Sequence, residues 1–167
     1  MIEELAQPAA ESDIRELAAL LVDAVASGAS VGFLDTLTVD EAAAWWRERL
    51  RDERAIVLVA RDAEGIAGTV QLLPAPMPNQ PHRADIAKLQ VHRRARGRGI
   101  GRALMNAIEE RARAAGFTLL TLDTKRGDAA ETLYESTGWT RVGVIPNYAL
   151  DPDGSPCDTV VFYKVLT

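Results

Sequence analysis

The sequence predicts an α+β fold: a mixed, mostly antiparallel sheet flanked by helices, with one parallel β-α-β crossover at a ligand cleft. In the first half of the chain, two apolar runs flank a turn, which is typical of an antiparallel hairpin. In the second half, a helical pattern at 100–115 separates apolar strands at 86–91 and 118–123. A crossover of this kind joins parallel strands with a right-handed connection. We expect residues 1–167 to form a single domain.

The N-terminal part predicts a short strand followed by a helix. Residues 2–6 suit the strand, and Ser12 or Asp13 can cap the helix. Gly28 marks the end of this helix. Its apolar face follows helical spacing and consists of Ile14, Leu17, Ala18, Leu21 and Val25.

A second helix is expected to begin at Thr38. Thr38 and Glu41 have the spacing of a capping box, in which each side chain bonds the other residue's backbone N–H. Trp45 and Trp46 follow on this helix. Adjacent helical residues point about 100° apart, so we expect one indole in the core and the other partly outside.

The middle of the chain predicts an antiparallel hairpin. Residues 55–60 form a continuous apolar run, as in a strand covered on both faces. A turn at 62–65 leads to a partner strand at 66–73. Four prolines follow, and we expect them to form a stiff loop that does not pair in the sheet: Pro74, Pro76, Pro78 and Pro81.

The remaining elements complete the sheet around the crossover. Gly116 closes the helix at 100–115, and Gly138 stops a short helix at about 127–137. Two last strands at 139–145 and 159–166 are joined through a turn-rich segment at 151–154.

Composition excludes several function classes. The net charge of −5 argues against nucleic acid or an anionic membrane as the main partner. The single cysteine, Cys157, cannot form an intrachain disulfide, and the N-terminus lacks the pattern of a signal peptide. We therefore expect a cytoplasmic protein. His82 and His92 have no partner at metal-ligand spacing, so no metal site is predicted.

The stretch around 97–101 predicts an anion site. An apolar strand runs into a loop with Gly97, Gly99 and Gly101, and a helix begins at once. The first N–H groups of a helix lack intrahelical partners, and the dipole is positive there. Between Ile86 and Ile108 there is no acidic residue, but there are six basic ones: Lys88, Arg93, Arg94, Arg96, Arg98 and Arg102. A polyphosphate ligand explains this segregation of charge.

Two nucleotide-binding motifs compete for this loop. A P-loop needs Lys-Ser/Thr after its last glycine, and that pair is absent. A dinucleotide fingerprint needs Gly-x-Gly-x-x-Gly, whereas Gly101 comes one residue early and Arg102 stands at the fingerprint position. Asp123 ends the next strand, about where a ribose-binding acid would lie, so dinucleotide binding remains a competitor.

The order Arg96-x-x-Gly99-x-Gly101 after an apolar strand resembles the acetyl-CoA motif of the GNAT superfamily of N-acetyltransferases. Other segments resemble the tabtoxin-resistance acetyltransferases within it: 28–33, 122–124, 133–134, 140–143 and 151–154. The resemblance implies a GNAT-like mixed sheet and acetyl-CoA as cofactor. It also implies two groups of cofactor-binding residues. The acetyl and pantetheine end would be held by Leu89, Gln90 and Val91, and the pyrophosphate by Arg96, Gly97, Arg98, Gly99, Ile100, Gly101 and Arg102. Arg83, Arg93 and Arg94 either reach the 3′-phosphate or lie in solvent.

The same resemblance assigns the catalytic residues. Tyr134 matches the tyrosine that GNAT enzymes present to the thioester sulfur as general acid, and Asp123 matches an acid used in substrate binding or proton removal. From the residues alone, Tyr134 could be a core residue and Asp123 a turn cap. Tyr148 and Asp158 are weaker candidates for the acceptor side. The segment at 28–34 is equally consistent with a plain loop or with the acceptor side of the cleft.

The expected reaction is direct acetyl transfer to a small, amino-acid-like or antibiotic-like amine acceptor. An amine with a pKa of about 10.4 is neutral in only about one molecule in 2,500 at pH 7, so a base or water relay helps. A protein or peptide N-acetyltransferase and a non-catalytic acyl-CoA sensor are the alternatives. Exposed edge strands would allow a homodimer.

Overall fold

The computed structural model describes residues 1–167 and confirms the mixed α+β architecture. The strands are β1 (Ile2–Glu4), β2 (Ile56–Asp62), β3 (Gly65–Pro74), β4 (Arg83–Val91), β5 (Leu119–Lys125), β6 (Thr140–Leu150) and β7 (Pro156–Val165). The helices are α1 (Glu11–Ala26), α2 (Val39–Arg49), α3 (Ile100–Ala114) and α4 (Ala129–Ser136), with a 3-10 turn at Arg93–Ala95. No helix combines the length and apolar content needed to cross a bilayer.

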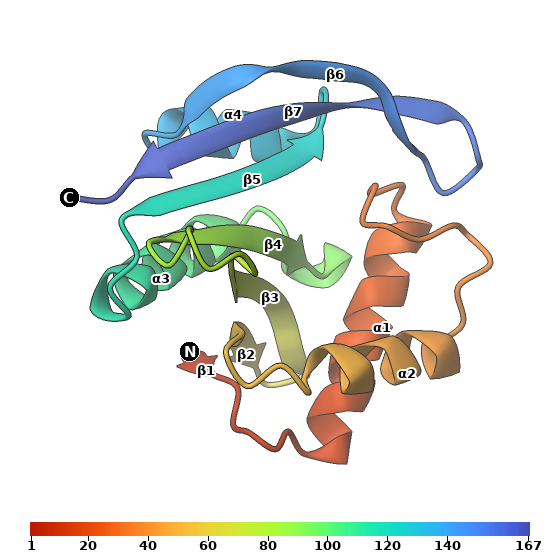
Figure 1. Cartoon of the computed structure of the whole chain (residues 1–167). Coiled ribbons are helices and arrows are strands. Elements are labelled where there is room, and N and C mark those ends of the chain that lie inside the picture. The colour runs from red at the N-terminus through yellow and green to blue at the C-terminus, as the bar shows by residue number, and fades with distance from the viewer.

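One seven-stranded sheet runs through the molecule in the order β1-β2-β3-β4-β5-β7-β6. Only β4 and β5 pair in parallel, as the crossover through α3 predicts, and all other neighbours are antiparallel. Figure 1 shows the chain passing from the β1–β4 part of the sheet through α3 to β5, β6 and β7.

The helices cover the two faces of the sheet, and each face has its own core. Val57 and Val59 point into a cluster with α1 and α2. Leu58 and Ala60, one residue along β2, point into a second cluster with α3 and α4. Successive side chains of β2 point to opposite faces of the sheet, so its continuous apolar run contributes to both cores.

The start of α2 and the positions of its two tryptophans are as predicted. At α2 the capping box is confirmed: Thr38 Oγ1 accepts a hydrogen bond from the N–H of Glu41 at 3.2 Å, and Glu41 Oε2 accepts one from the N–H of Thr38 at 2.9 Å. Trp46 is fully buried and Trp45 partly exposed, as predicted.

At α1 the predicted caps are wrong. The helix begins after Ala10, whose side chain caps nothing, so Ser12 and Asp13 lie inside the first turn. Asp13 accepts a hydrogen bond from Arg61 Nη2 at 2.9 Å instead, and an acidic residue in the first turn also favours the helix dipole.

The later strands are longer than expected. Antiparallel pairing continues from Ala149↔Cys157 to Leu150↔Pro156, so β6 and β7 form a hairpin around the turn at 151–154.

The proline-rich segment also starts later than predicted, because Pro74 ends β3 opposite Ala84. A proline in these positions removes only one donor from the ladder.

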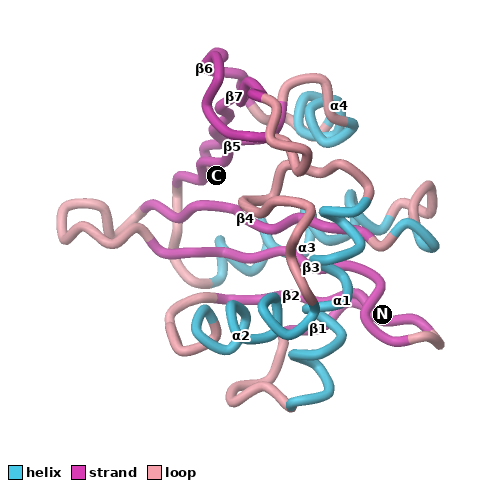
Figure 2. The backbone as a smooth tube through the Cα atoms, turned by 90° about the vertical axis from the view of Figure 1, so that its right-hand side faces the viewer, coloured by secondary structure: helices cyan, strands magenta, loops and turns pink.

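β4 has a bulge in its second half, next to the place where the sheet opens. Gln90 pairs with Thr69 and Ala87 with Gln71, so Lys88 and Leu89 together lie opposite Val70. Lys88 has a φ of 53°, which is uncommon for a residue with a side chain. Pairing between β4 and β5 stops at Asp85↔Thr121, and the two strands diverge beyond it. Figure 2 shows β5, β6 and β7 set apart from β1–β4.

Candidate active site

A cavity of about 810 Å³ lies where β4 and β5 diverge. It is walled by the end of α1 with the segment after it, the bulged half of β4, the start of α3, the end of β5, α4 and part of the β6–β7 hairpin. The predicted cofactor residues that line it are Leu89, Gln90, Val91, Arg96, Gly97, Gly99, Ile100 and Gly101. Both predicted catalytic residues, Tyr134 and Asp123, also line it.

The loop before α3 exposes a row of backbone donors. Gly97 and Gly99 have φ values of 74° and 76°, a region that glycine enters without strain. No backbone N–H from Gly97 to Arg102 donates to an acceptor within the chain, and the first bond of α3 runs from Ala103 N to Gly99 O. These free donors and the positive end of the helix dipole together make an anion cradle.

The arginines around the cradle are held by other side chains. Arg96 donates from Nε to the Val91 carbonyl at 3.1 Å and from Nη2 to Ser27 Oγ at 2.8 Å. Arg102 donates to Ser136 Oγ at 2.9 Å. Arg98 and Arg102 are not among the residues that line the cavity, although their backbone N–H groups belong to the cradle.

Three further arginines form ion pairs. The sequence left open whether they bind the 3′-phosphate or lie in solvent. Arg93 Nε lies 2.8 Å from Asp23 Oδ1, Arg94 pairs with Asp62, and Arg83 pairs with Asp85. The Arg83 pair lies within β4, at the end away from the loop. The Arg93 and Arg94 pairs tie the loop to α1 and to the end of β2, and their carboxylates offset positive charge near the loop.

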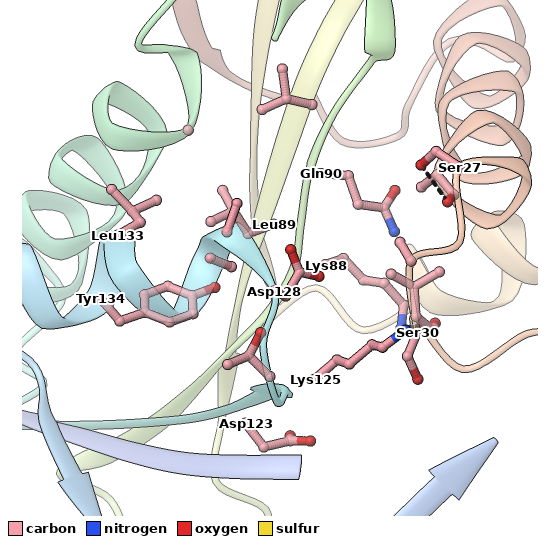
Figure 3. A pocket seen from close by; sticks show the side chains of 18 of the residues that line it. Ser27, Ser30, Lys88, Leu89, Gln90, Asp123, Lys125, Asp128, Leu133 and Tyr134 are labelled. Carbon is pink, nitrogen blue, oxygen red and sulfur yellow. Dashed lines mark hydrogen bonds between the residues drawn. The ribbon is translucent and has the colours of Figure 1, made fainter. Parts of the chain in front are cut away.

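Tyr134 reaches the cavity from α4. Its ring packs against Trp139 and Phe162, with centroids 5.9 and 5.7 Å away, so most of the side chain is core. Its hydroxyl points into the cavity, and no group of the chain pairs with it (Figure 3). Burial raises the pKa of Tyr134 above its usual range, and the carboxylates of Asp128 and Asp123 raise it further. The hydroxyl therefore carries its proton at neutral pH.

Asp123 lies at the end of β5, exposed to the cavity. Its Oδ2 accepts a hydrogen bond from Thr159 Oγ1 at 3.0 Å, which leaves the other oxygen free for a ligand. Tyr148 and Asp158, the weaker candidates, also line this side of the cavity.

The sequence placed Lys88 only among the basic residues near the predicted anion site, yet its side chain reaches the same cavity from the other wall. Nζ donates to the Val31 carbonyl at 2.8 Å and lies 5.2 Å from the Trp45 ring and 5.9 Å from the Phe33 ring. Burial lowers the pKa of Lys88; Arg49 lowers it further, while Asp123 raises it. The bulge that turns this side chain inward leaves no local signal in the sequence.

The cavity thus holds charged groups of both signs. Figure 3 shows Tyr134 and Leu133 on one wall and Lys88, Gln90 and Ser30 on the other, with Asp123 at the base. Lys125 forms an ion pair with Asp151 at 2.7 Å, and Cys157 Sγ lies 3.5 Å from Ser30 Oγ. No group of three or more His, Cys, Asp or Glu side chains is placed to hold a metal ion. The arrangement can bind a phosphate, supply one proton and receive a cation.

Comparison with known proteins gives consistent matches. A model of the acetyltransferase (GNAT) family matches residues 16–139. An uncharacterized N-acetyltransferase in the hisH-hisA intergenic region of Azospirillum brasilense is 33% identical over 115 residues, 68% of each protein. A structure of ribosomal-protein-alanine N-acetyltransferase from Brucella melitensis has a TM-score of 0.81 and 27% identity over 99% of both chains.

One solved structure also contains a ligand. The structure of yncA from Salmonella typhimurium was solved with its cofactor acetyl-CoA. It has a TM-score of 0.80 and 20% identity, and the match covers 100% of this chain and 94% of that one. At this identity the likeness shows a shared fold.

Proposed function

The chain belongs to the acetyltransferase (GNAT) family and is an acyltransferase, and from this premise we propose that it moves the acetyl group of acetyl-CoA directly to the amine of a small acceptor. The observation that carries the proposal is the row of free backbone N–H groups from Gly97 to Arg102 at the start of α3. A pyrophosphate needs several donors converging on one position, and these residues fit that requirement without any side-chain charge.

The proposed cofactor site runs from this cradle along the bulged half of β4. The backbone of Leu89, Gln90 and Val91 would hold the pantetheine and acetyl end, because the divergence from β5 leaves that stretch of strand without a neighbour on its cavity side. Acetyl-CoA supplies an activated acyl thioester when it is bound. Dinucleotide binding is the weaker interpretation, because the loop lacks the third glycine of that fingerprint.

Two side chains of the chain have suitable positions for proton transfer. The Tyr134 hydroxyl is protonated, unpaired and directed into the cavity, so it suits the role of general acid for the departing thiol. Asp123 offers a carboxylate oxygen that can bind a cationic amine or take its proton, directly or through water. The presence of Tyr134 in the cavity also argues against a non-catalytic sensor.

We propose that the acceptor is amino-acid-like. Asp123 at the base of the cavity would bind its amine, and Lys88 on the wall beside it would bind its carboxylate. The segments that resemble the tabtoxin-resistance acetyltransferases support this acceptor class and an antibiotic-like variant of it. A protein N-terminus is the second candidate, and the likeness to the Brucella ribosomal-protein-alanine N-acetyltransferase favours it. Turnover with free amino acids or with peptides separates the two.

With Tyr134→Phe, we expect kcat for thiol release from acetyl-CoA to fall at least about tenfold, because general acid catalysis contributes factors of about a hundred or more. The dissociation constant of CoA stays unchanged. A panel of amines, amino acids and short peptides provides the acceptors.

Tyr163→Phe is the matched control, since that tyrosine is exposed on β7 and lies outside the cavity. Unchanged kcat in Tyr134→Phe keeps the enzyme but excludes the general-acid role. If the wild-type chain does not bind CoA, the cradle argument itself is wrong.

The oligomeric state and the location stay predictions. The edge strand β6 exposes Val142, Ile145 and Tyr148, which would allow a second copy to pair there, and light scattering measures that. The free thiol of Cys157 supports a cytoplasmic setting.

A further inference from the structure

A second hollow of about 330 Å³ lies beside the main cavity, next to the point where β4 and β5 stop pairing. The two hollows share Ile86, Ala87, Asp123 and Tyr148, so the proposed amine site at Asp123 lies between them. Pockets for small ligands measure about 300–1,000 Å³, and the second hollow is at the small end of that range. This side pocket therefore suits one group of a ligand whose remainder lies in the main cavity.

The side pocket has a mostly apolar lining. Six of its nine residues are apolar or aromatic: Ile86, Ala87, Leu122, Ile145, Tyr148 and Val161. Ile86 and Leu122 also belong to the core under α3, whereas the other four pack in neither core. Ile145 is 44% exposed. The chain thus leaves apolar surface around this hollow that none of its own segments covers.

The apolar surface is uncovered because helices pack on only one face of this part of the sheet. Val160 and Phe162 of β7 point into the core with α3 and α4. Val161 lies between them and points to the opposite face, since successive side chains of a strand alternate. Figure 2 shows α4 beside β5, β6 and β7 on one side only.

The polar groups at the far end of the side pocket bind one another. Asp85 pairs with Arg83 and also accepts a hydrogen bond from Thr121 Oγ1. The same hydroxyl accepts a hydrogen bond from Arg83 Nη1 at 2.9 Å. A cationic side chain of a ligand would have to compete with Arg83 for Asp85, whereas an apolar side chain leaves these bonds intact.

We infer that the side pocket binds an apolar side chain of the acceptor. The acceptor is then an α-amino acid with an aliphatic side chain, either free or as the first residue of a peptide. Its amine binds Asp123, and its side chain lies against Val161 and Ile145, where loss of water from both apolar surfaces favours binding. The inference rests on the proposed function and adds the side chain to the amine and carboxylate named there.

Three acceptors test the side-chain class: norleucine, alanine and lysine. Lysine has the same four-carbon chain as norleucine but ends in an ammonium group. We expect kcat/KM of the wild type to be at least about tenfold higher for norleucine than for alanine, because an apolar pocket discriminates that strongly for one methylene. It is also higher for norleucine than for lysine. The same residues at the start of a tripeptide ending in Gly-Gly distinguish a peptide acceptor from a free amino acid.

Two variants locate the selectivity in the side pocket. Val161→Phe fills it, and we expect the norleucine-to-alanine ratio of kcat/KM to fall about tenfold. Val165→Phe is the matched control, since Val165 is 61% exposed on the same strand and lines neither hollow. The ratio removes any effect that is common to both acceptors.

Ile145→Ser removes part of the apolar wall at a half-exposed position of the edge strand, where the fold is less sensitive than at Val161. We expect the same ratio to fall about fourfold, the value of one methylene that loses its apolar contact. Val142→Ser is its control, because Val142 is 64% exposed on the same strand and lines neither hollow.

The inference is overturned if the wild type uses alanine as well as norleucine, or if it prefers lysine, since Asp85 would then select the side chain. It is also overturned if Val161→Phe and Ile145→Ser keep the wild-type ratio, or if the two controls lower it equally. The proposed function survives each of these results, because the wild type still acetylates an amine. A wild type that acetylates none of the amino acids or peptides contradicts both.

Discussion

At the scale of single residues, Lys88 shows how a backbone irregularity produces a functional group. In a regular strand its side chain would alternate with those of Ala87 and Leu89. The bulge and the positive φ turn it instead toward Val31, Phe33 and Trp45, at the edge of the cavity. Nζ has one hydrogen bond to the chain and three N–H donors, so two remain for a ligand.

Lys88→Met tests the carboxylate site on that wall. We expect KM for an amino acid acceptor to rise about tenfold, because a hydrogen bond to a charged group is worth about 1.5–3 kcal/mol. The control acceptor is the matching amine, which has the same side chain but no carboxylate, and its KM stays near the wild-type value. Steady-state kinetics with the amino acid and with this amine measures the difference. An equal rise for both would mean that Lys88 only supports the segment around Val31.

At the scale of elements, the end of α1 is tied to the loop that leads into the cradle. Asp23 Oδ2 accepts a hydrogen bond from the N–H of Arg93 at 2.9 Å, and Oδ1 accepts one from its Nε at 2.8 Å. A carboxylate in the last turn of a helix interacts unfavourably with the helix dipole, so the hydrogen bonds to Arg93 explain why an aspartate stands at this position. These hydrogen bonds therefore fix the position of the loop between β4 and α3 relative to α1.

The pKa of Asp23 gives this tie a pH dependence. Burial pushes that pKa up, but the hydrogen bonds from Arg93, helped by His92, lower it below its usual value. A carboxyl whose pKa is lowered on folding stabilises the fold above its unfolded pKa of about 3.9. That contribution is lost as the pH falls through the folded pKa.

Asp23→Asn therefore lowers the free energy of unfolding at pH 7 by about 1–2 kcal/mol. The difference from the wild type shrinks as the pH falls below the unfolded pKa of about 3.9 and through the lower folded pKa, because the carboxyl then becomes protonated in both states. Urea unfolding at pH 7 and pH 3 measures it, with Asp35→Asn on an exposed loop as control. A difference that is the same at both pH values would show that the charge of Asp23 is irrelevant.

Elements with local signals could be predicted from the sequence, and those fixed by distant partners could not. The Thr38 box and the crossover through α3 follow from spacing along the chain, whereas only the resemblance to the GNAT superfamily assigned Tyr134 and Asp123 to one site. Asp13 does not cap α1 and instead accepts a hydrogen bond from Arg61 of β2, a partner far along the chain. The inward turn of Lys88 depends on how β4 pairs with β3, which no stretch of sequence encodes by itself.

At the scale of the whole molecule, the cavity exists because the two parts of the sheet are joined over a short distance. Only Arg83, Ala84 and Asp85 of β4 pair with β5. Behind the cavity, Glu109 of α3 provides a second connection. Its Oε2 lies 2.7 Å from Nζ of Lys164 on β7, and its Oε1 accepts a hydrogen bond from the indole N–H of Trp139 at 3.0 Å.

Glu109→Gln tests whether this buried ion pair holds the two parts together. Glu109 is 5% exposed, and the change leaves the Lys164 ammonium with neutral oxygens only, among them the Thr137 carbonyl. Removing one member of a buried ion pair costs about 3 kcal/mol or more, so we expect a loss of that size in urea unfolding. The double variant Glu109→Leu with Lys164→Met is expected to lose less than Glu109→Gln, because it leaves no buried charge without a partner. If the double variant is the less stable of the two, the connection depends on the Trp139 hydrogen bond rather than on the ion pair.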